Sequence, residues 1–195
     1  MVRATEVIVL ASASPRRAAL LRSAGIDVRV VASGIVESAH PGEPPGDYAR
    51  RLAGAKAREV ASRTSGRFYL GADTVVVLEG AILEKPLDAF EAAAMLRRLS
   101  GRAHEVVTGF EVYDRGADRG VGAAVSTRVW FRRLHEPEVA AYVATGEPLD
   151  KAGGYGIQEG AASMVERIEG SYTNVVGLPL AEVVETLVRC GAAEW

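Results

Sequence analysis

Apolar residues along the chain fall in short β-branched runs that alternate with longer segments of helical spacing. The runs predict strands over residues 6–10, 28–32, 68–78, 81–83, 105–113 and 121–131. The helical segments begin at residues 14, 47, 88, 137 and 179. Such alternation, with long antiparallel-looking strands in the second half, predicts an α/β fold: a mixed twisted sheet with flanking helices and two lobes around a central cleft.

A polar interruption stands inside the apolar run Phe68–Leu78, where Gly71, Ala72 and Asp73 predict a break in the strand. An uncompensated carboxylate there costs several kcal/mol, so a metal ion or a lysine is expected beside Asp73. The alternative is a strand that ends at Gly71, with Asp73 in a turn. The β-branched run that follows immediately favours a functional carboxylate.

Composition narrows the class of protein. The chain has 195 residues, of which 48% are hydrophobic, and this suits one domain over residues 1–195. A net charge of -2 and a pI near 6.0 argue against broad capture of nucleic acid or an anionic membrane. One cysteine, Cys190, makes no internal disulfide, and His40, His104 and His135 lack metal-ligand spacing, so we expect a cytoplasmic protein. The apolar run near the amino terminus is too short for a signal peptide.

The segment Ser12–Arg17 reads Ser-Ala-Ser-Pro-Arg-Arg at the junction of a predicted strand and a predicted helix. Free backbone N–H groups, hydroxyls and two guanidiniums at a helix start form an anion site. The alternative is a capped surface helix with two solvated arginines. The segment lacks the glycines of a dinucleotide-binding fingerprint, which disfavours an oxidoreductase.

Glu37, Lys56 and Lys85 are weak signals singly, because such residues are usually solvated. Together with Asp73 they suit metal-assisted attack of water on a phosphoryl group. The Gly-rich stretch from residue 147 to 158, which ends in Gln158, has paired charges typical of a functional loop, with a flexible surface hairpin as the alternative.

These residues, in this order, resemble the Maf nucleotide pyrophosphatases over essentially the whole chain. The resemblance rests on Glu37, Lys56 and six segments: A-S-A-S-P-R-R at 11–17, G-A-D-T-V-V at 71–76, E-K-P at 84–86, L-S-G at 99–101, D-K-A-G-G-Y-G-I-Q at 150–158, and G-S-Y-T-N-V-V-G-L-P at 170–179. The resemblance implies a fold related to the inosine triphosphate pyrophosphatases, a divalent metal (Mg²⁺ or Mn²⁺), and a homodimer.

By the same resemblance, Asp73 is the proton acceptor that readies water, and Glu37 is its acidic partner at the metal. The expected triphosphate contacts are Ser12, Arg17, Lys56 and Lys85. The segment D-K-A-G-G-Y-G-I-Q at 150–158 is similar to the subgroup acting on dTTP and UTP, in which the positions of Arg16, Thr74 and Gln158 set base choice.

The leading hypothesis is therefore a nucleoside triphosphate pyrophosphatase that converts dTTP and UTP to the monophosphate and pyrophosphate. Modified pyrimidine analogues are expected substrates too, so that the enzyme limits incorporation of non-standard nucleotides. One alternative is a regulatory nucleotide-binding protein of division arrest with incidental hydrolysis. Another is a 7-methylguanosine triphosphate pyrophosphatase. The intact set of Glu37, Lys56, Asp73 and Lys85 favours catalysis, because binding alone does not need a carboxylate placed in a strand.

Overall fold

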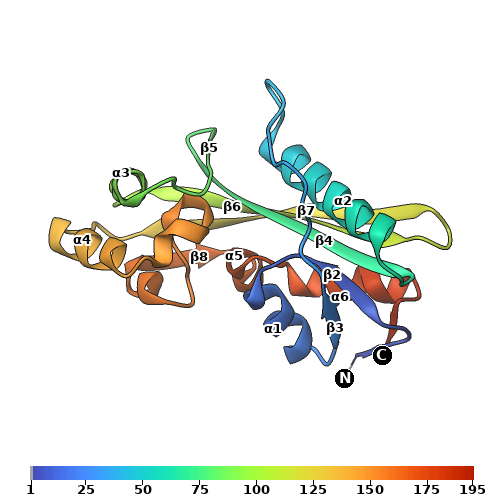
Figure 1. Ribbon diagram of the computed structural model, residues 1–195. Coiled ribbons are helices and arrows are strands. Elements are labelled where there is room, and N and C mark those ends of the chain that lie inside the picture. The colour runs from blue at the N-terminus through green and yellow to red at the C-terminus, as the bar shows by residue number, and fades with distance from the viewer. Residues whose placement is uncertain (1) are drawn as a thin grey trace. The chain divides into compact units, whose positions relative to one another are not determined.

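The computed structural model describes residues 2–195 and divides them between two units (Figure 1). The first unit holds the described residues up to Asp73 together with Thr108–Val125 and Gly177–Trp195. The second unit holds Thr74–Val107 and Ser126–Val176. The chain thus passes from one unit to the other four times, and strands β4, β6 and β7 contribute residues to both.

The helices and strands follow one another in an α/β order. They are β1 (Arg3–Ala4), β2 (Ile8–Ala11), α1 (Pro15–Ser23), β3 (Val28–Val30), α2 (Pro45–Arg63), β4 (Phe68–Leu78), β5 (Ala81–Leu83), α3 (Ala89–Leu99), β6 (Ala103–Asp114), β7 (Arg119–Phe131), α4 (Glu136–Ala144), β8 (Val165–Glu169), α5 (Tyr172–Val176), α6 (Leu180–Arg189) and β9 (Ala193–Glu194). Three short 3₁₀ helices stand between α4 and β8: η1 (Glu147–Asp150), η2 (Ala152–Gly154) and η3 (Gly160–Met164).

In the first unit, β2 is the parallel neighbour of both β3 and β4, and Ala11 lies opposite Gly71. Side chains alternate between the two faces of these strands. Ile8 and Leu10 pack in one apolar cluster with α1 and α6, whereas Val9 and Ala11 pack in another with α2. The helices therefore cover both faces of this part of the sheet, as Figure 1 shows with α2 on one side and α1 and α6 on the other.

Helix α2 approaches the sheet at two glycines. A Cβ added to Gly71 of β4 would lie 2.0 Å from the carbonyl oxygen of Ala53, and one added to Gly109 of β6 would lie 2.3 Å from the backbone of Ala49. Only hydrogen fits between helix and strand at these points. The contact fixes which turn of α2 lies over β4.

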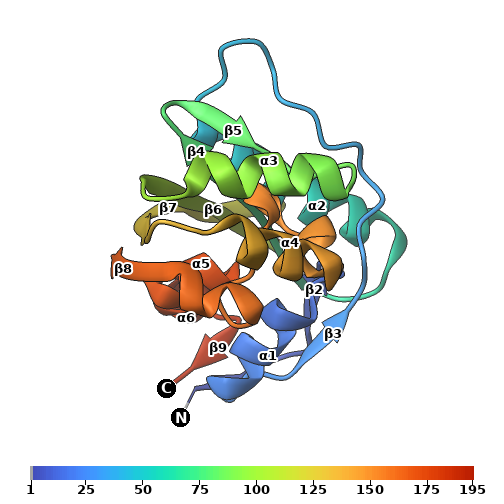
Figure 2. The same cartoon turned by 90° about the vertical axis from the view of Figure 1, so that its left-hand side faces the viewer.

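In the second unit, β5 pairs with β4 and β8 pairs with β7, both antiparallel. Helices α3 and α4 lie side by side (Figure 2). His104, Phe131 and Tyr155 form an aromatic cluster with ring centroids 4.8–5.4 Å apart.

The predicted α/β class, with a mixed sheet and flanking helices, is confirmed. The predicted break at Gly71–Asp73 is wrong, because β4 runs without interruption over 11 residues. The pairs β1–β9 and β7–β8 and helix α5 were not predicted. A single domain over residues 1–195 stays a prediction. No helix among residues 2–195 combines the length and apolar character needed to span a membrane.

Candidate functional site

Ser12 stands in the short connection between β2 and α1, where the sequence predicted an anion site. Its hydroxyl oxygen accepts hydrogen bonds from the backbone N–H of Ser14 at 3.2 Å and from Nη1 of Arg17 at 2.9 Å. Nε of Arg17 donates to the carbonyl oxygen of Gly177 at 2.8 Å. At the start of α1, hydrogen bonds to each other and to the backbone therefore hold the Ser12 hydroxyl and the Arg17 guanidinium in place. Arg16 precedes Arg17 in the sequence.

Arg17 also lies in the field of two carboxylates. Desolvation lowers the pKa of Arg17 from its ordinary value, and the negative charges of Asp73 and Glu37 act in the opposite direction. An arginine remains protonated under such a shift. The guanidinium is thus a fixed positive charge in the electrostatic surroundings of both predicted acidic residues.

The alternation of β4 and the close approach of α2 place Asp73 and Lys56 together. Gly71 and Asp73 point to the same face of the strand, and Gly71 is the position where α2 touches it. Lys56 lies one turn beyond Ala53, the helix residue at that contact. Its Nζ is 2.5 Å from Oδ1 of Asp73, and both side chains are buried. The predicted compensating lysine is present.

Glu37 completes this arrangement from the loop between β3 and α2. Its Oε1 lies 2.7 Å from Nζ of Lys56, and its side chain is 41% exposed. Two carboxylates, one buried in a strand and one half-exposed on a loop, therefore converge on a single ammonium group.

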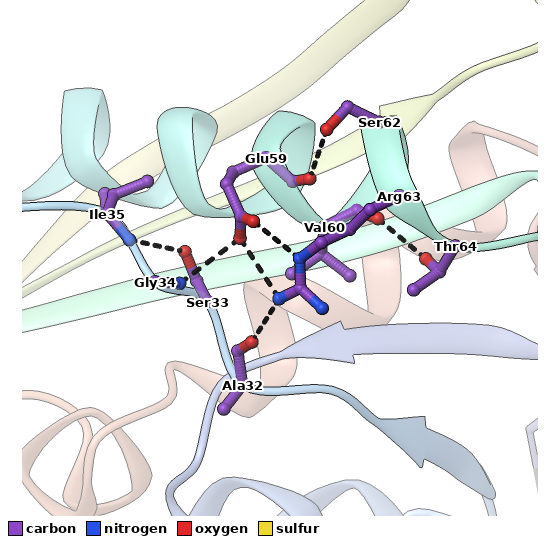
Figure 3. Close-up of polar contacts among 9 residues, drawn as sticks. All are labelled: Ala32, Ser33, Gly34, Ile35, Glu59, Val60, Ser62, Arg63 and Thr64. Atoms are coloured by element: carbon purple, nitrogen blue, oxygen red, sulfur yellow. Dashed lines mark hydrogen bonds and ion pairs between the residues drawn. The ribbon is translucent and has the colours of Figure 1, made fainter.

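Helix α2 holds both sides of the loop that carries Glu37. On one side, Gly34 donates its backbone N–H to Glu59 at 3.3 Å, and Arg63 donates to the carbonyl oxygen of Ala32 at 2.5 Å (Figure 3). Glu59 and Arg63 also pair with each other at 2.6 Å.

On the other side of Glu37, Nη2 of Arg51 donates to the carbonyl oxygen of Ser38 at 2.9 Å. Arg51 pairs at 2.6 Å with Glu43, and this hydrogen bond lowers the pKa of the Glu43 carboxyl to about 2. Arg51 and Glu59 were not predicted as functional residues from the sequence, although the spacing of Glu59 and Arg63 is that of an i,i+4 ion pair.

The donor set permits one kind of metal site. No group of three or more His, Cys, Asp or Glu side chains suited to a metal ion occurs among residues 2–195. Glu37 and Asp73 nevertheless direct carboxylate oxygens at one cation, the ammonium of Lys56. Mg²⁺ is commonly held by one or two carboxylates and completes its shell with water and substrate phosphate oxygens. The two residues fit such an ion.

The remaining predicted residues lie in the second unit. Thr74 is half-buried in β4, whereas Lys85, after β5, and Gln158, between η2 and η3, are exposed. The Gly-rich segment is ordered by Lys151, whose buried Nζ pairs with Asp150 at 2.7 Å and with Glu159 at 2.9 Å. The segment contains two short 3₁₀ helices, η1 and η2, and η3 begins two residues after it, so the alternative of a surface hairpin is wrong.

The structure brings Ser12, Arg17, Glu37, Lys56 and Asp73 into one network in the first unit. In the second unit, the backbone N–H of Gly153 donates to the carbonyl oxygen of Glu84 at 3.1 Å. This hydrogen bond connects the Gly-rich segment with the residue that precedes Lys85.

Comparison with known proteins identifies the family of this chain. A model of the family described as Maf-like protein matches residues 7–190. A protein of Geotalea uraniireducens named dTTP/UTP pyrophosphatase is 58% identical over 194 residues, with 100% of both chains covered. A protein of the same name from Geobacter sulfurreducens is 60% identical over 185 residues, with 95% of this chain and 97% of the relative covered.

A third protein of that name, from Pelotomaculum thermopropionicum, is 47% identical over 184 residues, with coverage of 94% and 96%. The crystal structure of protein VC0702 from Vibrio cholerae aligns with 94% of this chain and 93% of its own at a TM-score of 0.43 and 12% identity, which is too distant to bear on function. With a family model that matches nearly the full length and relatives at 58–60% identity, the chain belongs to the family of Maf-like proteins.

Proposed function

We propose that this protein hydrolyses dTTP and UTP to the nucleoside monophosphate and pyrophosphate. The names of relatives at 58–60% identity over nearly the whole chain support this substrate class. The observation that carries the proposal is the convergence of Asp73 and Glu37 on Lys56, at 2.5 and 2.7 Å, because it combines acidic and basic groups that phosphoryl transfer requires.

In the proposed reaction, the oxygen of a water molecule attacks the α-phosphorus. The bond between the α-phosphorus and the oxygen that bridges it to the β-phosphorus breaks, and pyrophosphate leaves with that electron pair. Asp73 accepts the proton of the attacking water. A carboxylate has two oxygens, so the ion pair of Lys56 with Oδ1 does not exhaust the capacity of Asp73 to accept a proton.

We propose that Glu37 and Asp73 also hold a divalent cation, Mg²⁺ or Mn²⁺, together with phosphate oxygens of the substrate. When bound, such an ion neutralises negative charge at the phosphoryl group that is attacked. Lys56, which pairs with both carboxylates, is one proposed contact of the triphosphate. Ser12, Arg17 and Lys85 are the other proposed triphosphate contacts.

We assign recognition of the base to Arg16, Thr74 and Gln158. Uracil and thymine present an acceptor at O4 and a donor at N3, whereas cytosine reverses both. An arginine only donates, and a glutamine both donates and accepts, so this set matches the uracil edge and opposes cytosine. Polar groups that a bound substrate buries without a partner discriminate by about 10⁴-fold in favourable cases, whereas the C5 methyl contributes only about 1–3 kcal/mol.

The test is a turnover screen over dTTP, UTP, dCTP, CTP, the purine triphosphates and 7-methylguanosine triphosphate, with Mg²⁺ or Mn²⁺ and with excess EDTA. We expect comparable turnover of dTTP and UTP, release of monophosphate and pyrophosphate, poor turnover of the others, and none in EDTA. Hydrolysis of CTP as fast as UTP, or preference for 7-methylguanosine triphosphate, would contradict the assignment. Gln158→Glu should impair dTTP turnover more than folding, because it directs a charged acceptor at O4.

Two further predictions accompany the proposal. Turnover of modified pyrimidine triphosphates in the same screen would support a role in limiting incorporation of non-standard nucleotides. The homodimer and the cytoplasmic location stay predictions, and sedimentation of the purified protein tests the former.

A further inference from the structure

The aromatic cluster of the second unit contains a buried histidine that the proposed reaction does not use. His104 in β6 is 3% exposed, and its Nε2 lies 2.7 Å from the hydroxyl oxygen of Tyr155. Its other nitrogen, Nδ1, is buried without a hydrogen-bond partner among residues 2–195. Among residues 2–195, the imidazole ring of His104 thus hydrogen-bonds through Nε2, to Tyr155.

Tyr155 belongs to the Gly-rich segment, three residues before Gln158. Its ring packs against His104 and against Phe131 at centroid distances of 5.4 and 4.8 Å. Tyr155 and Ile157 are buried, whereas Gln158 is exposed. The buried side chains of Tyr155 and Ile157 therefore anchor the segment close in sequence to Gln158, a residue assigned to base recognition.

A second anchor fixes the other end of the same segment. Gly153, with φ +69°, lies so close to Val76 of β4 that an added Cβ would be 2.9 Å from the valine side chain. The backbone hydrogen bond from Gly153 to Glu84 lies at the same place. Val76 is two residues from Thr74, and Glu84 precedes Lys85. The segment that contains Gln158 is thus held at positions close in sequence to Thr74 and Lys85. These are the other two residues of the proposed site in the second unit.

We propose that His104 and Tyr155 are positioning residues for base selection: their hydrogen bond locks the segment Lys151–Gln158, so that Gln158 presents its amide in one orientation. The inference rests on the proposed function. Burial lowers the pKa of His104 to about 4, so the ring is neutral near neutral pH and the lock does not depend on a charge.

The central experiment is Tyr155→Phe, which removes only the hydroxyl and leaves the ring contacts with Phe131. We expect KM for dTTP to rise about tenfold and discrimination between dTTP and dCTP, as the ratio of kcat/KM, to fall about tenfold, as for loss of one hydrogen bond, with kcat within about twofold. Amide hydrogen exchange of the peptide covering residues 151–159 should accelerate. The single variant His104→Gln retains a polar side chain, so it should lose less of the discrimination than Tyr155→Phe does.

The matched control is Tyr113→Phe in the first unit, which also removes one hydroxyl, bonded to Asp118 at 2.8 Å. It should change neither discrimination nor exchange of residues 151–159. Unchanged discrimination in Tyr155→Phe would overturn the positioning role, as would an equal loss of kcat/KM for both nucleotides with a lowered unfolding temperature. If wild-type protein hydrolyses neither dTTP nor UTP, the proposed function fails, and the exchange measurement still decides whether the bond holds the segment. Should Tyr155→Phe not fold, His104→Gln carries the same comparison.

Discussion

The ammonium nitrogen of Lys56 lies 2.5 Å from Oδ1 of Asp73, so a helix side chain and a strand side chain form a buried ion pair at the centre of the candidate site. Glu37 shares the same ammonium at 2.7 Å. Removing one partner of a buried pair leaves an uncompensated charge, which makes each of the three residues informative when replaced.

Asp73→Asn keeps the shape of the side chain but removes the proton acceptor. We expect kcat for dTTP to fall about a hundredfold or more, with substrate still bound, as for loss of a general base. Lys56 retains Glu37 as a partner, so the unfolding temperature should change little. Steady-state kinetics and calorimetry check both statements, and an unchanged kcat would transfer the role of base to Glu37.

Lys56→Met removes the cation and leaves Asp73 and Glu37 facing each other. Without metal, the free energy of unfolding should fall by about 3 kcal/mol, as for a broken buried pair. Millimolar Mg²⁺ or Mn²⁺ should restore part of that loss by binding to the two carboxylates, and should stabilise wild-type protein less, because its own ammonium occupies the position. Thermal unfolding with and without metal measures this. Equal metal responses of the two proteins would show that Lys56 and the metal do not compete.

Gly71→Ala tests the helix contact that positions Lys56. The added Cβ meets the carbonyl oxygen of Ala53 at 2.0 Å, so α2 must move away from β4. We expect a loss of about 3 kcal/mol in stability, at the upper end for overpacking, and a lower kcat because Lys56 moves with the helix.

The control for this variant is Gly34→Ala, where an added Cβ meets nothing within 4 Å. Its stability should stay within about 0.5 kcal/mol of wild type, as for surface substitutions. Urea titrations of both variants give the comparison. A Gly71→Ala protein as stable and active as Gly34→Ala would mean that the contact does not position Lys56.

The buried neutral His104 predicts a particular acid sensitivity. Its pKa is about 4 in the folded protein against the ordinary 6.5, so between these values the unfolded chain binds a proton that the folded one does not. Its contribution to stability is therefore complete above about pH 6.5 and is lost as the pH falls toward 4, by on the order of 3 kcal/mol over this pH range. Urea unfolding at several pH values should show this slope in wild type and not in His104→Gln. Parallel curves for the two proteins would refute it.

Features that depend on neighbouring residues in the sequence could be predicted, whereas features that depend on contacts between distant residues could not. Asp73 was identifiable because a carboxylate in an apolar run violates local periodicity, and the need for a compensating lysine or metal ion followed from its desolvation. The interruption predicted around Gly71 was wrong for a related reason. Gly71 does not end the strand; it allows α2 to lie close to β4. The sequence around Gly71 does not reveal this tertiary contact.

Other features depend on contacts between residues distant in sequence. Arg51 and Glu59 resemble ordinary solvated helix residues until the loop that carries Glu37 is seen to lie against them. The hydrogen bond between His104 and Tyr155 joins residues 51 positions apart, so the sequence alone indicated only that His104 lacks the spacing of a metal ligand.

The last nineteen residues, Gly177–Trp195, belong to the unit that begins the chain. Leu178, Val183 and Leu187 pack in the same cluster as Ile8 and Leu10, and β9 pairs with β1. A ribosome thus releases the first strands long before the residues that cover them. The nascent chain therefore carries a partly uncovered apolar sheet face until α6 has been synthesised, and apolar surface exposed in this way favours aggregation. A premature stop codon just before α6 would therefore yield an aggregating product and not a smaller enzyme.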